Sequence, residues 1–146
     1  SRSLNMKSES RDHLVFGTVP YGRMEGTLYE YPTEKSEKIL KGYDKREGFN
    51  GGSTSVYLRE EVIAFTKDNP EGVYCFVYIT NEESDQYQGS FEKQEIAELL
   101  LENPDFDEYF YGTSIALDAI NGRDKYLNKL KAEHWPKKKE KLKNLG

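Results

Sequence analysis

The sequence predicts a single α+β domain with an antiparallel or mixed sheet. Strand-like segments come first along the chain and helical segments follow, without the regular alternation that a doubly wound parallel sheet requires. The 146 residues are enough for one hydrophobic core and too few for two ordinary domains. With 36% hydrophobic and 13% aromatic residues, the chain has enough apolar surface to fold despite 32% charged residues.

The first predicted elements are a strand and a helix. Residues 26–31 (Gly-Thr-Leu-Tyr-Glu-Tyr) alternate like a half-buried strand, which Pro32 ends. A helix is expected to follow, because Thr33 offers a capping hydroxyl and Gly48 a stop signal. Three apolar side chains fall on one face of this helix: Ile39, Leu40 and Tyr43.

A hairpin and three helices complete the predicted fold. Residues 57–65 and 73–79 are rich in Val, Ile, Tyr and Phe, and residues 67–72 (Lys-Asp-Asn-Pro-Glu-Gly) between them have turn chemistry, so we expect an antiparallel pair. Apolar periodicity then predicts helices over residues 91–101, 113–120 and 125–132.

The charge distribution divides the chain at residue 134. The formal net charge is -5, but the last twelve residues carry five Lys and one Glu, which leaves -9 for residues 1–134. Residues 82–108 hold ten carboxylates and one basic residue, so such a surface repels phosphate and nucleic acid is not an expected partner. We expect one domain over residues 1–134 and a solvated basic tail over 135–146; polyanion binding by the tail is the alternative.

Several function classes lack the residues that they need. No stretch is apolar enough to span a membrane, and residues 1–4 do not resemble a signal peptide, so a cytoplasmic protein without a membrane partner is expected. One Cys excludes an internal disulfide, and two distant His residues form a poor metal site. No glycine pattern lies between a strand and a helix to hold a nucleotide cofactor. The oligomeric state stays open.

Glu47 is the candidate catalytic residue. It precedes Gly48, where the backbone can bend sharply and direct a carboxylate inward instead of into solvent. A desolvated carboxylate is more basic, which suits a group that carries a proton. The alternative is a surface glutamate that pairs with Lys45 or Arg46.

The remaining candidates have structural interpretations. The strand tyrosines are expected to form a sheet wall rather than to bind substrate: Tyr29, Tyr31, Tyr57, Tyr74 and Tyr78. Cys75, between two aromatic residues, is expected to be a small buried side chain, and His13 and His134 are expected on the surface.

Five segments in order resemble the γ-glutamylcyclotransferase family. Four are Met-Glu-Gly-Thr-Leu-Tyr-Glu-Tyr at 24–31, Tyr-Asp-Lys-Arg-Glu-Gly at 43–48, Tyr-Leu-Arg-Glu-Glu-Val at 57–62 and the strand at 73–79. The fifth is the helical segment at 111–119, followed by its ending Lys-Tyr-Leu-Asn-Lys-Leu at 125–130. The family motifs are "V-x-G-x-x-Y", "L-D-x-x-E-G" and "Y-x-x-x-x-V". Here Tyr43 replaces the usual Leu. The resemblance covers residues 23–131.

The resemblance implies a fold, a reaction and two site residues. The fold is a small β-barrel with flanking helices. The reaction is intramolecular aminolysis, in which the α-amine of a γ-glutamyl group attacks its own γ-carbonyl and releases 5-oxoproline, without a cofactor. The glutamate of the "D-x-x-E-G" motif is the general acid and base, which assigns this role to Glu47, and Tyr111 matches a tyrosine that lines the substrate.

One family motif is absent from the sequence. Family members begin with a strand ending in "Y-G-S-N", whose turn binds the γ-glutamyl group. Residues 6–12 (Met-Lys-Ser-Glu-Ser-Arg-Asp) instead resemble the family's following segment, "F-x-K-x-S-x-D". A truncated enzyme, a divergent member and one part of a two-part protein all fit this pattern. A catalytically inactive binding module on the same fold is therefore the alternative function.

Overall fold

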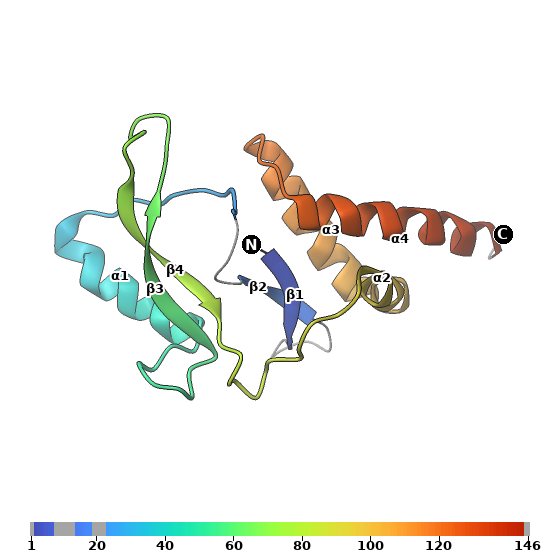
Figure 1. Ribbon diagram of the computed structural model, residues 1–146, viewed down its shortest axis with the longest axis horizontal. Coiled ribbons are helices and arrows are strands. Elements are labelled where there is room, and N and C mark those ends of the chain that lie inside the picture. The colour runs from blue at the N-terminus through green and yellow to red at the C-terminus, as the bar shows by residue number, and fades with distance from the viewer. Residues whose placement is uncertain (1, 8–13, 19–22, 145–146) are drawn as a thin grey trace.

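A computed structural model of the protein describes residues 2–7, 14–18 and 23–144. Within these ranges the chain forms an α+β fold, as the sequence predicts (Figure 1). The elements are, in order, β1 (Arg2–Lys7), β2 (Leu14–Thr18), α1 (Thr33–Arg46), β3 (Tyr57–Ala64), β4 (Val73–Thr80), α2 (Lys93–Glu102), α3 (Pro104–Ala119) and α4 (Lys125–Asn144).

The strands form two separate antiparallel pairs. The predicted hairpin is confirmed: β3 pairs with β4 in a continuous register from Tyr57 opposite Thr80 to Ala64 opposite Val73. The second pair, β1 with β2, lies between this hairpin and the helices α2–α4 (Figure 1). The expected closed barrel is wrong for the described residues, which form two two-stranded sheets. Alternating apolar residues predict a half-buried strand, but they do not specify how many other strands pair with it.

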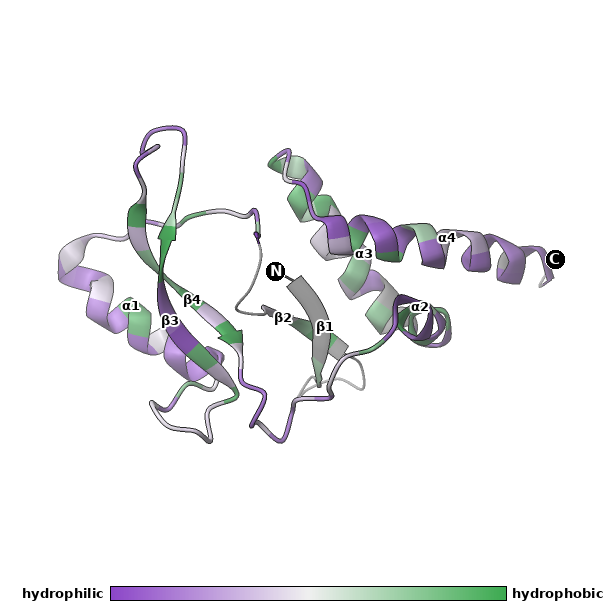
Figure 2. Cartoon of the chain, in the orientation of Figure 1, coloured by the Kyte–Doolittle hydropathy of each residue, from purple (hydrophilic) through white to green (hydrophobic). Residues whose placement is uncertain are grey.

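The hydrophobic core lies among α2, α3 and α4. The three predicted helices are confirmed, although α3 and α4 are longer than expected. The buried core cluster consists of Ile96, Leu100, Phe106, Phe110, Leu117, Leu127 and Leu130. Figure 2 shows hydrophobic residues along α3, whereas the outer end of α4 is mostly hydrophilic. Among the described helices, none has the length and apolar character needed to cross a membrane.

Residues 26–31 do not form the predicted strand. They are irregular and lead into α1, and the side chain of Tyr29 is 69% exposed. The Tyr31 hydroxyl instead bonds the Tyr43 hydroxyl on α1 at 2.5 Å. This segment therefore contacts a helix through a side chain. A strand forms only when its backbone pairs with that of another strand, and residues 26–31 have no such pairing within the described part of the chain.

The lysine-rich C-terminal residues continue α4 up to Asn144. Lys137 pairs with Glu98 on α2 at 3.1 Å, and the Lys141 ammonium donates to the backbone carbonyl of Leu101 at 2.6 Å. Part of the acidic stretch and part of the basic stretch thus lie side by side. The helix continues through Pro136, which removes one helical hydrogen bond.

Two side chains differ from their expected burial. His134 is completely buried in the helical core rather than on the surface, because α4 packs this face against α3. Cys75 is only half-buried, because its hairpin is covered less fully than a central sheet. His13 and most of the segment at residues 6–12 lie outside the described residues.

Candidate functional site

Glu47 occupies the C-terminal cap of α1. Its backbone amide bonds the Tyr43 carbonyl at 2.8 Å. The amide of Gly48 then bonds the Lys45 carbonyl at 3.4 Å, and the amide of Phe49 bonds the Asp44 carbonyl at 2.8 Å. This pair of bonds, with Gly48 at a φ of 66°, is a Schellman motif. The predicted stop signal therefore holds the backbone of Glu47 at a defined helix end.

The Glu47 side chain is largely enclosed and is also paired. It is 23% exposed, whereas its partner Arg46 is 67% exposed. The Arg46 guanidinium donates to one carboxylate oxygen, Oε1, from Nε at 2.7 Å and lies 2.6 Å from it through Nη2. The carboxylate is thus partly shielded from solvent and bound to the neighbouring arginine.

A shallow, open depression of about 330 Å³ lies beside Arg46. Its lining includes Arg46, whose guanidinium also lies 4.7 Å from the centre of the Tyr43 ring. The other lining residues are Tyr31, Ile39 and Gly42. Arg46 therefore connects the Glu47 carboxylate with a mainly apolar, aromatic surface on α1.

Two tyrosine hydroxyls meet at one residue of β2. The Tyr57 hydroxyl donates to the Phe16 carbonyl at 3.3 Å, and the Phe16 amide donates to the Tyr109 hydroxyl at 3.0 Å. Burial raises the pKa of Tyr57, and the nearby Tyr109 and the negative charge of Glu47 raise it further. Tyr57 therefore stays a neutral hydrogen-bond donor, and its environment is linked electrostatically to Glu47.

Tyr111 lies on the side of α3 that packs against α4. Its hydroxyl is 3.1 Å from Nδ1 of His134, and the Lys138 ammonium lies 5.0 Å from the centre of its ring. Tyr109, two residues earlier, instead reaches β2. Residues two positions apart on a helix point about 200° apart, so they contact different elements. Tyr111 therefore contacts α4, whereas Tyr109 contacts β2, a strand that the residue pattern does not predict.

The described residues contain no group of three or more His, Cys, Asp and Glu side chains placed to bind a metal ion. Glu47 pairs with Arg46, and its negative charge also acts on Tyr57. Such a set can take up, release and orient protons.

Gly48→Ala is expected to destabilise the protein by roughly 2–4 kcal/mol, because a left-handed backbone penalises a side chain and the added methyl group overpacks its surroundings. A Cβ atom there would lie 2.6 Å from Cγ2 of Val56. The matched control is Gly42→Ala in the same helix, where nothing lies within 4 Å. This control should stabilise the protein by about 0.5–1 kcal/mol through helix propensity. Urea denaturation of both variants checks the opposite signs.

The structure is that of an α+β protein in which a half-buried carboxylate at the end of α1 pairs with an arginine beside a shallow aromatic depression. Residues 7–133 match the family described as ChaC-like protein, and the chain belongs to this family. The family is part of the γ-glutamylcyclotransferase-like superfamily, and its members are generally enzymes of that kind. Comparisons with curated proteins and with solved structures give no significant match.

Proposed function

We propose that this chain releases 5-oxoproline from γ-glutamyl amines or peptides, with Glu47 as the general acid and base. One observation carries the proposal: Glu47, inside the family-matched region, is 23% exposed and stands at a rigid helix cap. Family membership supports a small γ-glutamyl molecule as the substrate. No electron transfer occurs in the reaction, so the proposal includes no cofactor.

The proposed reaction exchanges one amide bond for another within the substrate. The α-ammonium group loses a proton to Glu47, and the resulting amine attacks the γ-carbonyl carbon to close a five-membered lactam. The attacking nitrogen then gives its second proton to solvent, and the bond from this carbon to the leaving nitrogen breaks as Glu47 returns its proton to the leaving nitrogen. The products are 5-oxoproline and a free amine or amino acid. Because both reacting groups belong to one molecule, holding them in a folded conformer lowers the entropic barrier.

The contacts of Glu47 suggest which oxygen carries the proton. Arg46 occupies Oε1 with two guanidinium nitrogens, so we assign proton transfer to Oε2. In this proposal Arg46 restrains the carboxylate through charge-assisted contacts to this one oxygen. Tyr111 remains the proposed substrate-lining residue through the family resemblance. The depression lined by Arg46 is the position proposed for the leaving group.

The test is a direct assay for 5-oxoproline. The chain is incubated with γ-glutamyl dipeptides, a γ-glutamyl tripeptide and γ-glutamyl alkylamines, and the product is measured by mass spectrometry. N-acetylated versions of the same substrates serve as controls, because their blocked α-amine cannot attack. The assay is repeated with an N-terminal extension that ends in the "Y-G-S-N" turn. Absence of product with both proteins and all substrates would reject the proposal.

A binding module on the same scaffold is the second candidate function. The hairpin exposes large apolar side chains that a monomeric enzyme does not require, including Phe65 at 70% and Tyr74 at 75% exposure. This candidate predicts that γ-glutamyl ligands bind, as measured by calorimetry, while no 5-oxoproline forms. A cytoplasmic location and the absence of nucleic-acid partners stay predictions from the sequence.

A further inference from the structure

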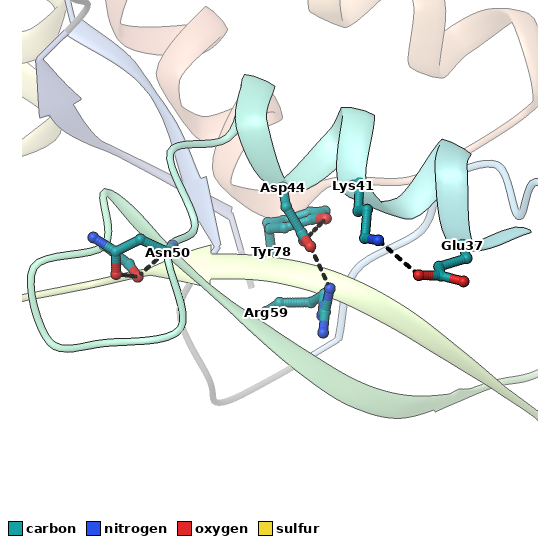
Figure 3. A network of polar contacts seen from close by, with 7 residues as sticks. Glu37, Lys41, Asp44, Asn50, Arg59 and Tyr78 are labelled. Carbon is teal, nitrogen blue, oxygen red and sulfur yellow. Dashed lines mark hydrogen bonds and ion pairs between the residues drawn. The ribbon is translucent and has the colours of Figure 1, made fainter.

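Asp44 anchors the last turn of α1 to the β3–β4 hairpin. Arg59 Nη1 on β3 lies 2.5 Å from Asp44 Oδ2, and the Tyr78 hydroxyl on β4 donates to Oδ1 at 2.6 Å (Figure 3). Arg59 and Tyr78 are directly opposite in the strand register, so their side chains leave the same face of the hairpin. Both oxygens of one carboxylate are therefore held by two neighbouring strands.

Arg59 also lies over two aromatic rings, and one of them belongs to Phe49, two residues after Glu47. Its guanidinium carbon lies 4.9 Å from the centre of the Phe49 ring and 5.1 Å from that of Phe76. Asp44 precedes Glu47 by three residues and Phe49 follows it by two, and the Phe49 amide bonds the Asp44 carbonyl at 2.8 Å. One side chain thus contacts both ends of the turn that contains Glu47.

This anchor is more enclosed than the surface ion pairs of the same helix. The side chains of Arg59 and Asp44 are 25% and 19% exposed, whereas those of Lys41 and Glu37 are 73% and 82% exposed. Burial, followed by the hydrogen bond to Asp44, raises the pKa of Tyr78, so its hydroxyl remains protonated and keeps donating. Exposed ion pairs contribute little to stability, whereas hydrogen bonds in a partly buried site are electrostatically stronger.

We infer that Arg59 is a positioning residue that holds the Asp44–Phe49 turn, and with it the Glu47 carboxylate, in the geometry of the reaction, with Tyr78 as its partner. The inference rests on the proposed function of Glu47. Arg59 does not touch Glu47 in this scheme and carries no proton. It acts through the backbone between Asp44 and Phe49, where a small displacement changes the distance between the carboxylate and a bound substrate.

The test compares Arg59→Met and Tyr78→Phe with the matched control Lys41→Met, which removes a pair on the same helix (Figure 3). A misplacement of about 1 Å costs on the order of 100-fold in rate, so we expect Arg59→Met to lower kcat by roughly 10- to 100-fold, while KM changes by less than about threefold. Arg59→Lys should recover part of the loss. The control should keep the wild-type kcat. An unchanged kcat in folded Arg59→Met would overturn the inference.

A second measurement separates this inference from the proposed function. Hydrogen exchange of the amides at residues 47–49 is followed without substrate in the same variants. Faster exchange is expected in Arg59→Met and, to a smaller extent, in Tyr78→Phe, but not in Lys41→Met. If the wild-type protein releases no 5-oxoproline, the proposed function fails, and exchange alone then decides whether Arg59 holds the turn. Unchanged exchange in both hairpin variants would reject the anchor. If Arg59→Met does not fold, Tyr78→Phe, which removes only one hydroxyl, provides the test of the anchor instead.

Discussion

Glu47→Gln is expected to lower kcat for 5-oxoproline release by about 100- to 10,000-fold, the usual contribution of a positioned acid or base. The amide keeps the size of the side chain and cannot accept a proton from the substrate ammonium group. KM should change much less, because the assigned role of Glu47 is proton transfer rather than substrate binding. Steady-state kinetics with the best γ-glutamyl substrate from the panel measure both constants.

The control for this experiment is Glu37→Gln on the same helix. Glu37 is 82% exposed and pairs with Lys41 at the surface, so its loss should leave kcat unchanged. Thermal denaturation of both variants verifies that they are folded. Full activity in folded Glu47→Gln would show that Glu47 is not the general acid and base, and that it serves only as an ion-pair partner of Arg46.

Phe110→Ala should lower the free energy of unfolding by about 3–5 kcal/mol, because deletion of a buried ring loses its burial and leaves a cavity. Phe110 is completely buried on α3, and its ring meets those of Tyr111 and His134 at centroid distances of 5.3 and 6.3 Å. Its removal therefore weakens the contact between α3 and α4. Urea denaturation measures the change, and a shift in the transition midpoint is expected.

Ile115→Ala is the control on the same helix. Ile115 is 67% exposed, so its truncation should change stability by no more than about 0.5 kcal/mol. If both substitutions had equal effects, the hydrophobic core would not be centred on Phe110. If Phe110→Ala lost stability but Ile115→Ala did not, the assignment of the two faces of α3 would be supported.

The site was predictable where neighbouring residues determine the conformation. Gly48 can end a helix without a side-chain penalty, so the sequence locates Glu47 at the end of α1. The turn at residues 67–72 likewise brings β3 and β4 together. The selection of Glu47 as catalytic residue required the family resemblance, because its side-chain chemistry alone allowed a surface ion pair as well.

The sequence pattern was insufficient where burial depends on a distant partner. Residues 26–31 alternate like a strand, yet their Tyr31 side chain contacts α1. His134 is a polar residue that could lie at the surface, but contact with α3 buries its side chain. Closure of a barrel also requires pairing between strands far apart in the chain, which the periodicity of each strand does not specify.

The amino-acid sequence by itself determined the α+β class, the helix end at Glu47 and the β3–β4 hairpin, because capping, turns and periodicity act over a few residues. Tertiary structure decided which side chains surround that helix end. The contact between Arg59 and Asp44 joins residues 15 apart, and that between Phe16 and Tyr109 joins residues 93 apart. Such contacts form only when whole elements pack, so their partners follow from the arrangement of helices and strands in space.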